Sequence, residues 1–149
     1  MKILFVCTGN TCRSPMAEYI FRQMLKDNNI EDVEVSSCGV ACSNDNPISE
    51  NSYLALKEIN IDASAHKSKS ITIKDLLESD YIFTMTDNHK AFLKANFNAV
   101  SNVKTLGEVV GLGNITDPFG SNLDVYRLCR DELKMMLSLL LTKLFADRL

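Results

Sequence analysis

The N-terminal segment restricts the fold of this chain more than any other part of the sequence. Residues 1–6 are mostly apolar and too short a run for a helix, so they predict a buried strand. Ser14 followed by Pro15 predicts the N-cap and the first turn of a helix. The chain must therefore pass from a strand into a helix through the short loop at residues 7–13.

The rest of the chain continues this alternation. Strands are predicted at residues 33–37, 80–85 and 102–106, and helices at residues 14–26, 49–59 and 88–97, with a short helical turn at residues 74–77. A long last helix is predicted from Ser121 onward by an apolar face that repeats at three and four: Tyr126, Cys129, Leu133, Met136, Leu137, Leu140 and Leu144. We therefore predict an α/β fold over residues 1–149, a single-domain three-layer sandwich with a four-stranded parallel sheet flanked by helices.

Charge and composition exclude several kinds of partner. The net charge is −3, and the lack of a basic run argues against nucleic acid or an anionic membrane surface. We also find no signal peptide and no stretch of about 18 apolar residues, which predicts a soluble cytoplasmic protein, and we expect a monomer. The five cysteines form no C-x2-C pair and the chain has two histidines, so we expect no metal and no organic cofactor.

The loop at residues 7–13 has the features of an anion site. Its backbone N–H groups and the positive end of the following helix would surround an anion, and Arg13 would add two parallel donors for phosphoryl oxygens. Cys7 would lie in the same positive field, which predicts a thiol pKa well below the ordinary value and a nucleophilic thiolate. The alternative is a buried structural cysteine beside a surface arginine. The turn at Gly9 and Asn10, between a strand and a helix, favours the anion site.

A carboxylate on a second loop could complete a catalytic site. Residues 114–120 follow the fourth predicted strand and should reach the same edge of the sheet, because the carboxyl ends of parallel strands meet there. Asp117 lies in this loop before Pro118. It could protonate the group that leaves phosphorus and later accept a proton from water. The alternative is that Asp-Pro only begins a turn.

Residues 7–18, CTGNTCRSPMAE, together with residues 117–120, DPFG, resemble the low-molecular-weight protein tyrosine phosphatase family, and the likeness covers essentially the whole chain. The resemblance implies a nucleophile at Cys7, a catalytic arginine at Arg13, and a general acid and base at Asp117. The implied phosphate-binding residues are Thr8, Gly9, Asn10, Thr11, Cys12 and Arg13. The implied supporting residues are Ser14, whose hydroxyl bonds the Cys7 thiolate, and Asn10, Ser36 and His66. From the sequence alone, His66 would be assigned to the surface or the core.

Thr11 distinguishes a branch of this family. The sequence is most similar to the bacterial protein-arginine phosphatases, because Thr11 stands where the tyrosine phosphatases usually carry isoleucine or leucine. A hydroxyl at this position could pair with the N–H groups of a phosphorylated guanidinium, which an apolar side chain would leave unpaired. Phe119 and Gly120 also offer less surface for stacking on a phenol ring than two aromatic residues would. The resemblance implies phosphorylated proteins as substrates, with phosphoarginine as the target and phosphotyrosine as the alternative. A neutral substitution at Thr11 is the other interpretation.

Cys12 lies inside the loop, and in the family this cysteine forms a disulfide with the nucleophile. A bond between Cys7 and Cys12 would protect the thiolate from over-oxidation and switch the activity off reversibly. The alternative is a small packed thiol, because the spacing does not give the separation of the two sulfur atoms. The remaining cysteines, Cys38, Cys42 and Cys129, are expected to be packing residues.

Three other functions match the sequence less well. An arsenate reductase of this fold would need two more redox cysteines near the third strand, and residues 80–90 contain none. A phosphocarrier would need neither Arg13 nor Asp117. A noncatalytic phosphopeptide-binding module would gain nothing from a thiolate and an acid. The sequence therefore predicts a phosphatase that acts through a cysteinyl-phosphate intermediate.

Overall fold

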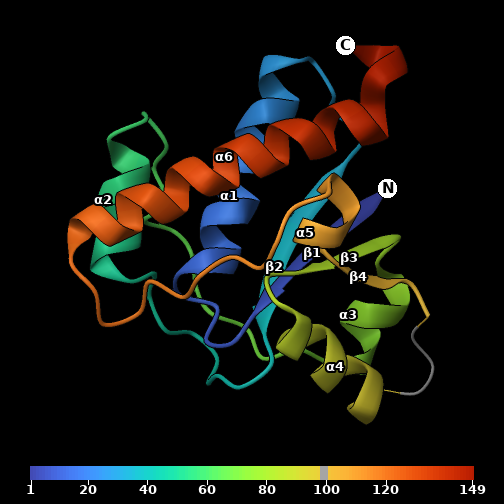
Figure 1. The fold of residues 1–149 in the computed structure, drawn as a ribbon, viewed down its shortest axis with the longest axis horizontal. Helices are drawn as coiled ribbons and strands as arrows, with labels where there is room; N and C mark the ends of the chain where they lie inside the picture. Colours follow the sequence, from blue (N-terminus) through green and yellow to red (C-terminus); the bar gives the residue numbers. More distant parts are fainter. Residues whose placement is uncertain (98–100) are drawn as a thin grey trace.

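The computed structural model describes residues 1–97 and 101–149 and contains the predicted parallel sheet (Figure 1). Its four strands are β1 (Lys2–Cys7), β2 (Glu34–Gly39), β3 (Tyr81–Thr84) and β4 (Val103–Thr105), in the order β2-β1-β3-β4. Each pair of neighbouring strands is parallel. The predicted α/β fold with a four-stranded parallel sheet is confirmed.

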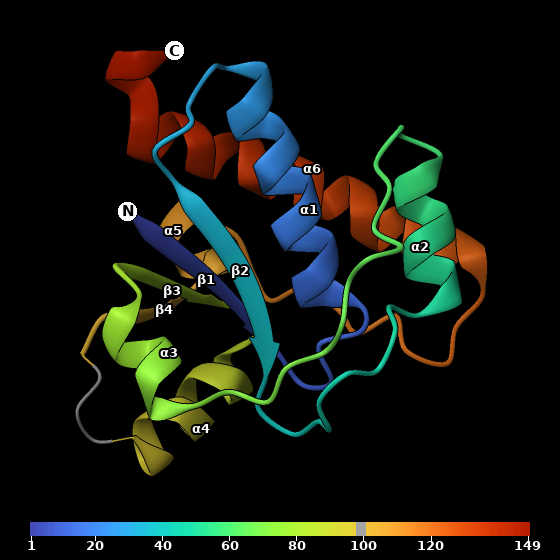
Figure 2. The same cartoon turned by 180° about the vertical axis from the view of Figure 1, so that it is seen from behind.

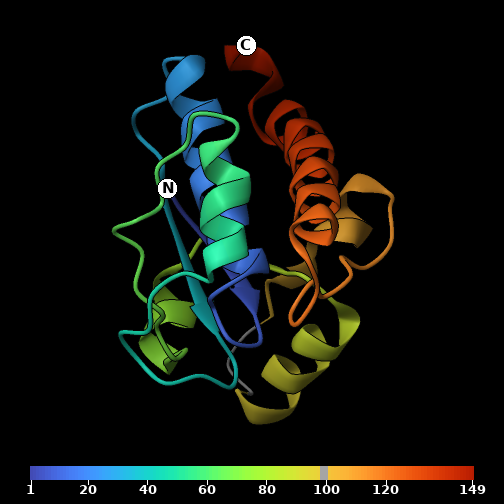
Figure 3. The same ribbon diagram turned by 90° about the vertical axis from the view of Figure 1, so that its left-hand side faces the viewer.

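Helices cover both faces of this sheet (Figures 1 and 2). One side carries α1 (Arg13–Asp27), α2 (Glu50–Lys57), α5 (Leu106–Val110) and α6 (Leu123–Phe145), and the other carries α3 (Ile73–Glu78) and α4 (Asp87–Asn96). Figure 3 shows α1 and α2 running alongside α6, which is followed by a short 3-10 helix (Ala146–Arg148). None of the described helices is both long enough and apolar enough to span a membrane.

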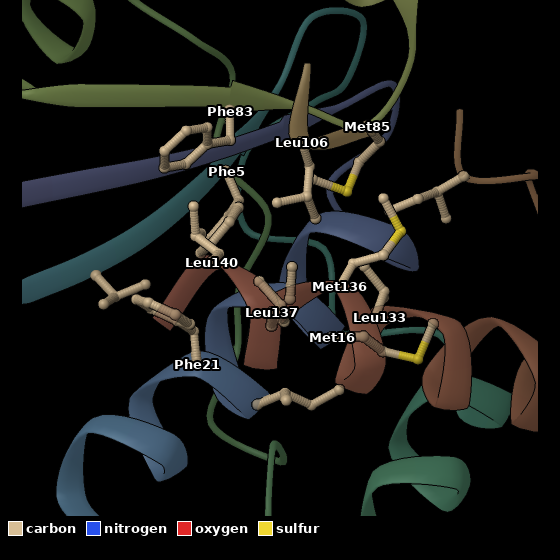
Figure 4. Close-up of a cluster of buried hydrophobic side chains, with 14 of the residues drawn as sticks. Phe5, Met16, Phe21, Phe83, Met85, Leu106, Leu133, Met136, Leu137 and Leu140 are labelled. Atoms are coloured by element: carbon tan, nitrogen blue, oxygen red, sulfur yellow. The ribbon is translucent and has the colours of Figure 1, made fainter. Parts of the chain in front are cut away.

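The two faces of β1 belong to two hydrophobic clusters. Ile3 and Phe5 pack toward α1 and α6, whereas Leu4 and Val6 pack toward α3 and α4. The rings of Phe5 and Phe21 meet edge to face with their centroids 5.9 Å apart. Figure 4 shows the larger cluster, in which ten labelled side chains meet: Phe5, Met16, Phe21, Phe83, Met85, Leu106, Leu133, Met136, Leu137 and Leu140. Because β1 is buried on both faces, the position of its carboxyl end is fixed by the core.

The predicted element boundaries agree with the structure to within two residues, with two exceptions. The predicted N-cap at Ser14 is wrong, because α1 begins at Arg13 with Cys12 as its N-cap residue, and the Ser14 hydroxyl is directed at Cys7. The sequence pattern also does not predict α5, whose five residues are too few to show a helical period. The predicted cap of α2 at Ser49 is confirmed.

The end of β2 approaches the loop after β1 very closely. A Cβ atom on Gly39 would lie 2.5 Å from the Thr8 carbonyl oxygen and 2.8 Å from the Cys42 sulfur. Two residues beyond Gly39, the Ala41 N–H donates to the same Thr8 carbonyl at 3.0 Å. Because glycine has no side chain, the backbone at the end of β2 can pack directly against the Thr8 carbonyl group of the loop.

Candidate active site

The Cys7 side chain lies at the carboxyl end of β1, beneath the loop that leads into α1. Its sulfur atom is buried and lies 2.9 Å from the Ser14 hydroxyl oxygen. The backbone amides of Ser14 and Asn10 also lower the pKa of the thiol. The Ser14 hydroxyl, which is within hydrogen-bond distance of the sulfur, favours the thiolate form.

Two opposing influences act on the Cys7 thiol. Burial raises the pKa of the thiol, whereas the bonds from Ser14 and Asn10 and the charge of Arg13 lower it. Burial is the larger influence, so the pKa lies above its ordinary value. The prediction of a pKa well below the ordinary value is therefore wrong, because the sequence reveals the donors of the loop but not the loss of solvent around the sulfur.

Asn10 supports the loop from beneath. Its backbone is left-handed, with φ at 53°, a conformation that asparagine tolerates better than most residues. The side-chain NH₂ donates to the hydroxyl groups of Ser14 at 2.8 Å and Ser37 at 2.9 Å, and the side-chain carbonyl accepts from the Lys69 N–H at 2.9 Å. Nε2 of His66 lies 2.8 Å from the Asn10 backbone carbonyl oxygen. The Asn10 side chain is fully buried and shapes the loop from below.

Ser37 occupies the place in this network that the resemblance assigns to Ser36. Ser36 is exposed, whereas Ser37 is buried, accepts from Asn10 and donates to the Glu18 carboxylate at 2.7 Å. The choice of Ser36 is therefore wrong: neighbouring strand residues point to opposite faces, so an error of one position selects the exposed serine. Glu18, which the sequence analysis does not single out, pairs with Arg22 at 2.6 Å and ends the network.

Arg13 connects the first loop with the loop that carries Asp117. Its Nη1 donates to the Ile115 carbonyl oxygen at 3.1 Å, and its Nη2 lies 3.4 Å from Oδ2 of Asp117. Arg13 is buried, whereas 50% of the Asp117 side chain is exposed. The second Asp117 oxygen accepts from the Phe119 N–H at 3.1 Å, which closes the turn. The acid loop is thus held by the arginine of the first loop.

A cavity of about 240 Å³ joins these groups. It is lined by Cys7, Thr8, Gly9, Thr11, Cys12, Arg13, Asp117 and Phe119. The structure therefore brings the three predicted catalytic residues together with all of the predicted phosphate-binding residues except Asn10, which lies beneath the loop. Within residues 1–97 and 101–149, no three His, Cys, Asp or Glu side chains gather closely enough to hold a metal ion. Loop N–H groups and a guanidinium are suited to an anion.

Cys12 lines the same cavity as Cys7, and both thiols are reduced. The Cys12 sulfur lies 3.4 Å from the hydroxyl oxygen of Ser49 and 3.4 Å from that of Tyr126. Burial and the contact with Cys12 raise the pKa of Tyr126 to about 12, so its hydroxyl stays protonated near neutral pH. The predicted disulfide between Cys7 and Cys12 stays a prediction, and its formation would replace these contacts.

His89 is a further residue of the site, and the sequence gives no direct indication of it. It is buried on α4, with Nε2 at 2.8 Å from the Thr8 hydroxyl oxygen and Nδ1 at 3.1 Å from that of Thr86. Burial and the Arg13 charge lower the pKa of His89 to about 4. The ring is therefore neutral near pH 7 and holds the Thr8 side chain of the loop without adding a positive charge.

Replacement of Ser14 by alanine should raise the pKa of the Cys7 thiol further, because the Ser14 hydroxyl is the strongest of the groups that lower it. The pH dependence of inactivation by iodoacetamide measures this pKa. The control is Ser138→Ala, which removes an exposed hydroxyl on α6 and should leave the thiol unchanged. A Cys7 pKa that stays the same or falls in Ser14→Ala would contradict the role of the hydroxyl.

Known proteins resemble the chain over its full length. The family model for low molecular weight phosphotyrosine protein phosphatase matches residues 2–149. The protein-arginine-phosphatase of Bacillus subtilis (strain 168) is 40% identical over 152 residues, which cover 99% of this chain and 99% of that protein. The low molecular weight protein-tyrosine-phosphatase PtpB of Staphylococcus haemolyticus is 39% identical over 143 residues. The matched region covers 95% of this chain and 99% of that protein.

A solved structure gives the same result. A cysteine-to-serine mutant of the YwlE arginine phosphatase, with a phosphorylated active-site serine, superposes with a TM-score of 0.94 at 37% identity. The superposition covers 99% of this chain and 98% of the other. The match of sequence, fold and family model shows that the chain is a phosphatase that belongs to the low molecular weight phosphotyrosine protein phosphatase family.

Proposed function

We propose that this phosphatase removes the phosphoryl group from phosphoarginine residues of proteins. The observation that carries the proposal is the cavity in which Cys7, Arg13 and Asp117 meet beside the Thr11 side chain. Two relatives with the same full-length coverage are named protein-arginine-phosphatases, which supports the same target here. The predicted cytoplasmic location and monomeric state are part of this proposal.

The first chemical step transfers the phosphoryl group to Cys7. The thiolate attacks phosphorus in line with the bond to the leaving nitrogen, so that an S–P bond forms as the P–N bond breaks. Asp117 donates a proton to the departing guanidino nitrogen. The N–H groups of the loop and the Arg13 guanidinium stabilise the equatorial oxygens. The products are a cysteinyl phosphate and an unmodified arginine side chain.

The second step releases phosphate. A water molecule attacks phosphorus while the Asp117 carboxylate accepts its proton, and the S–P bond breaks to regenerate the Cys7 thiolate. The Ser14 hydroxyl, 2.9 Å from the sulfur, stabilises that thiolate in both steps. Asn10, Ser37 and His66 act as positioning residues, because they hold the loop without lining the cavity.

Phosphotyrosine is the second candidate substrate. PtpB proteins of several staphylococci are 37–39% identical to this chain and are named protein-tyrosine-phosphatases. Phe119 lines the cavity and is 77% exposed, so its ring is available to stack on a phenol. The Thr11 hydroxyl favours phosphoarginine, because a guanidinium carries N–H groups that an aromatic ring lacks.

Replacement of Thr11 by isoleucine should shift the preference from phosphoarginine toward phosphotyrosine. An unpaired buried donor costs about 1–3 kcal/mol, so the ratio of kcat/KM for the two substrates should fall by about 5- to 150-fold. Phosphate release from matched phosphoarginine and phosphotyrosine peptides measures the ratio. Thr11→Ser keeps the hydroxyl and should retain most of the preference. An unchanged ratio in Thr11→Ile would remove Thr11 as the determinant.

Replacement of Asp117 by asparagine should slow a substrate with a poor leaving group by about 10²- to 10⁴-fold, which is the usual contribution of a general acid. p-Nitrophenyl phosphate, whose leaving group needs little protonation, should be slowed far less. Steady-state rates with phenyl phosphate and p-nitrophenyl phosphate make the comparison. The exposed carboxylate of Asp124 on α6 provides the control Asp124→Asn, which should affect neither substrate. Equal slowing of both substrates would rule Asp117 out as the acid.

Mild peroxide should inactivate the enzyme reversibly if Cys7 and Cys12 form a disulfide. The Cys7 thiolate would first be oxidised to a sulfenic acid, and attack by Cys12 would then form the S–S bond with release of water. Dithiothreitol should restore the activity of the wild type and of the control Cys42→Ser, but not that of Cys12→Ser, in which Cys7 oxidises further. Full recovery in Cys12→Ser would show that Cys12 has no such role.

A further inference from the structure

A second cavity adjoins the catalytic cavity on the side of α4. It has a volume of about 490 Å³, and its wall includes three residues that also line the catalytic cavity: Thr8, Arg13 and Asp117. Helix α4 follows β3 directly and lies beside the carboxyl end of the sheet (Figure 1). We call this cavity the α4 groove and define it by Thr8, Arg13, Asp117, Val40, Phe92 and Asn114.

The described residues that line the α4 groove carry little net charge. Arg13 and Asp117 lie 3.4 Å apart and largely neutralise each other. The rest of the wall combines the apolar side chains of Val40, Ile115 and Phe92 with uncharged polar ones. A charged side chain would meet no unpaired opposite charge here, whereas an apolar side chain could be removed from water against Val40 and Phe92, the two apolar residues of the wall that are not fully buried.

Phe92 is the most exposed apolar part of this wall. The side chain lies on α4, and 41% of the residue is accessible to solvent. A phenylalanine that is buried further by a ligand contributes favourable free energy in proportion to the apolar area it loses to solvent. Among the apolar side chains of the groove, Phe92 can therefore lose the most solvent-exposed area to an apolar ligand.

The base of the α4 groove is held in place by contacts with the rest of the fold. His89 joins the Thr8 hydroxyl to that of Thr86, and the Ile115 N–H donates to the Met85 carbonyl oxygen at 3.0 Å. Oδ1 of Asn114 accepts from the backbone N–H of Asp87 at 3.0 Å, which connects the loop after α5 to the start of α4. The groove is thus formed before a ligand arrives, which reduces the entropy lost on binding.

We propose that the α4 groove binds an apolar side chain of the substrate protein that lies close in sequence to the phosphorylated residue. This inference rests on the proposed function, since it requires a phosphorylated polypeptide in the catalytic cavity. The shared wall of Thr8, Arg13 and Asp117 is the reason for choosing this occupant, because a chain anchored by its phosphoryl group at the loop has the groove immediately beside it. A free small phosphate ester would leave the groove unused.

The test compares peptides that differ only beside the phosphorylated residue. One set carries leucine at the flanking positions, and matched sets carry alanine or glutamate. The wild type should show the lowest KM for the leucine set. Phe92→Ala should raise the KM of the leucine set by about 5- to 30-fold, as expected for the loss of one buried aromatic contact, with little change in kcat. p-Nitrophenyl phosphate, which is too small to reach the groove, should respond much less.

Leu128→Ala is the matched control, because Leu128 is an apolar residue of α6 that is 70% exposed and lies outside both cavities. It should leave the KM of every peptide unchanged. Phe92→Lys provides a gain of function, since a cation in the groove should shift the preference of the enzyme from leucine to glutamate. Equal KM values for the three wild-type sets, or equal effects of Phe92→Ala on peptides and p-nitrophenyl phosphate, would overturn the proposal.

Each peptide set is prepared in a phosphoarginine form and a phosphotyrosine form. If the enzyme hydrolyses only the phosphotyrosine form, the proposed arginine specificity fails, and the flanking comparison is still made on that form. If both forms are hydrolysed without a flanking preference, the groove proposal fails while the phosphatase function stands. The two hypotheses are therefore separated by the same set of measurements.

Discussion

The catalytic cavity depends on the shape of the loop between β1 and α1, and Asn10 fixes that shape. Its left-handed backbone costs about 1–2 kcal/mol in an ordinary residue. Three side-chain hydrogen bonds and one to its carbonyl oxygen offset this cost, at about 0.5–1.5 kcal/mol for each bond. The partners come from α1, from β2 and from the segment between α2 and α3. The loop is therefore held by three separate parts of the chain, and its N–H groups are oriented before any phosphate binds, which is the condition for electrostatic catalysis.

The position of Cys7 subjects its thiol to two opposing effects, since burial raises the pKa and the neighbouring groups lower it. The core encloses β1 on both faces and removes solvent from the sulfur, which opposes ionisation of the thiol. The groups at Ser14, Asn10 and Arg13 favour the thiolate, and they lie in the loop that we propose binds the phosphoryl group or at the start of the helix that follows it. A nucleophile in this position is poorly solvated, and a poorly solvated thiolate that is held by a few fixed donors is reactive. The burial of the Cys7 sulfur and the reactivity of its thiolate thus both result from the position of Cys7 at the end of a central strand.

Local patterns were sufficient to predict the main features of the fold and to select Cys7, Arg13 and Asp117, which line one cavity. The alternation of strands and helices predicts the parallel sheet, and the rule that parallel strands end at one edge brings Asp117 to Cys7 and Arg13. The supporting contacts could not be derived in this way. Ser36 and Ser37 are neighbours on β2 whose side chains point to opposite faces of the sheet, and the sequence does not show which of them meets Asn10. His89 and Thr8, which are in contact, are 81 positions apart in the sequence. Such contacts depend on packing between distant segments, as does the desolvation that reverses the predicted change in the Cys7 pKa.

Arg13 connects the loop after β1 to the loop that carries Asp117. Its guanidinium contacts the Ile115 carbonyl oxygen and the Asp117 carboxylate, so the proposed acid is positioned by the side chain that we propose binds phosphoryl oxygens. The Ile115 N–H in turn is bound to the chain just after β3, which ties the acid loop to the sheet. Arg13 and Asp117 also form the wall between the catalytic cavity and the α4 groove. A side chain bound in the α4 groove would therefore lie against two of the proposed catalytic residues, and it would restrict the substrate chain at the point where phosphorus has to align with the sulfur and the proposed acid.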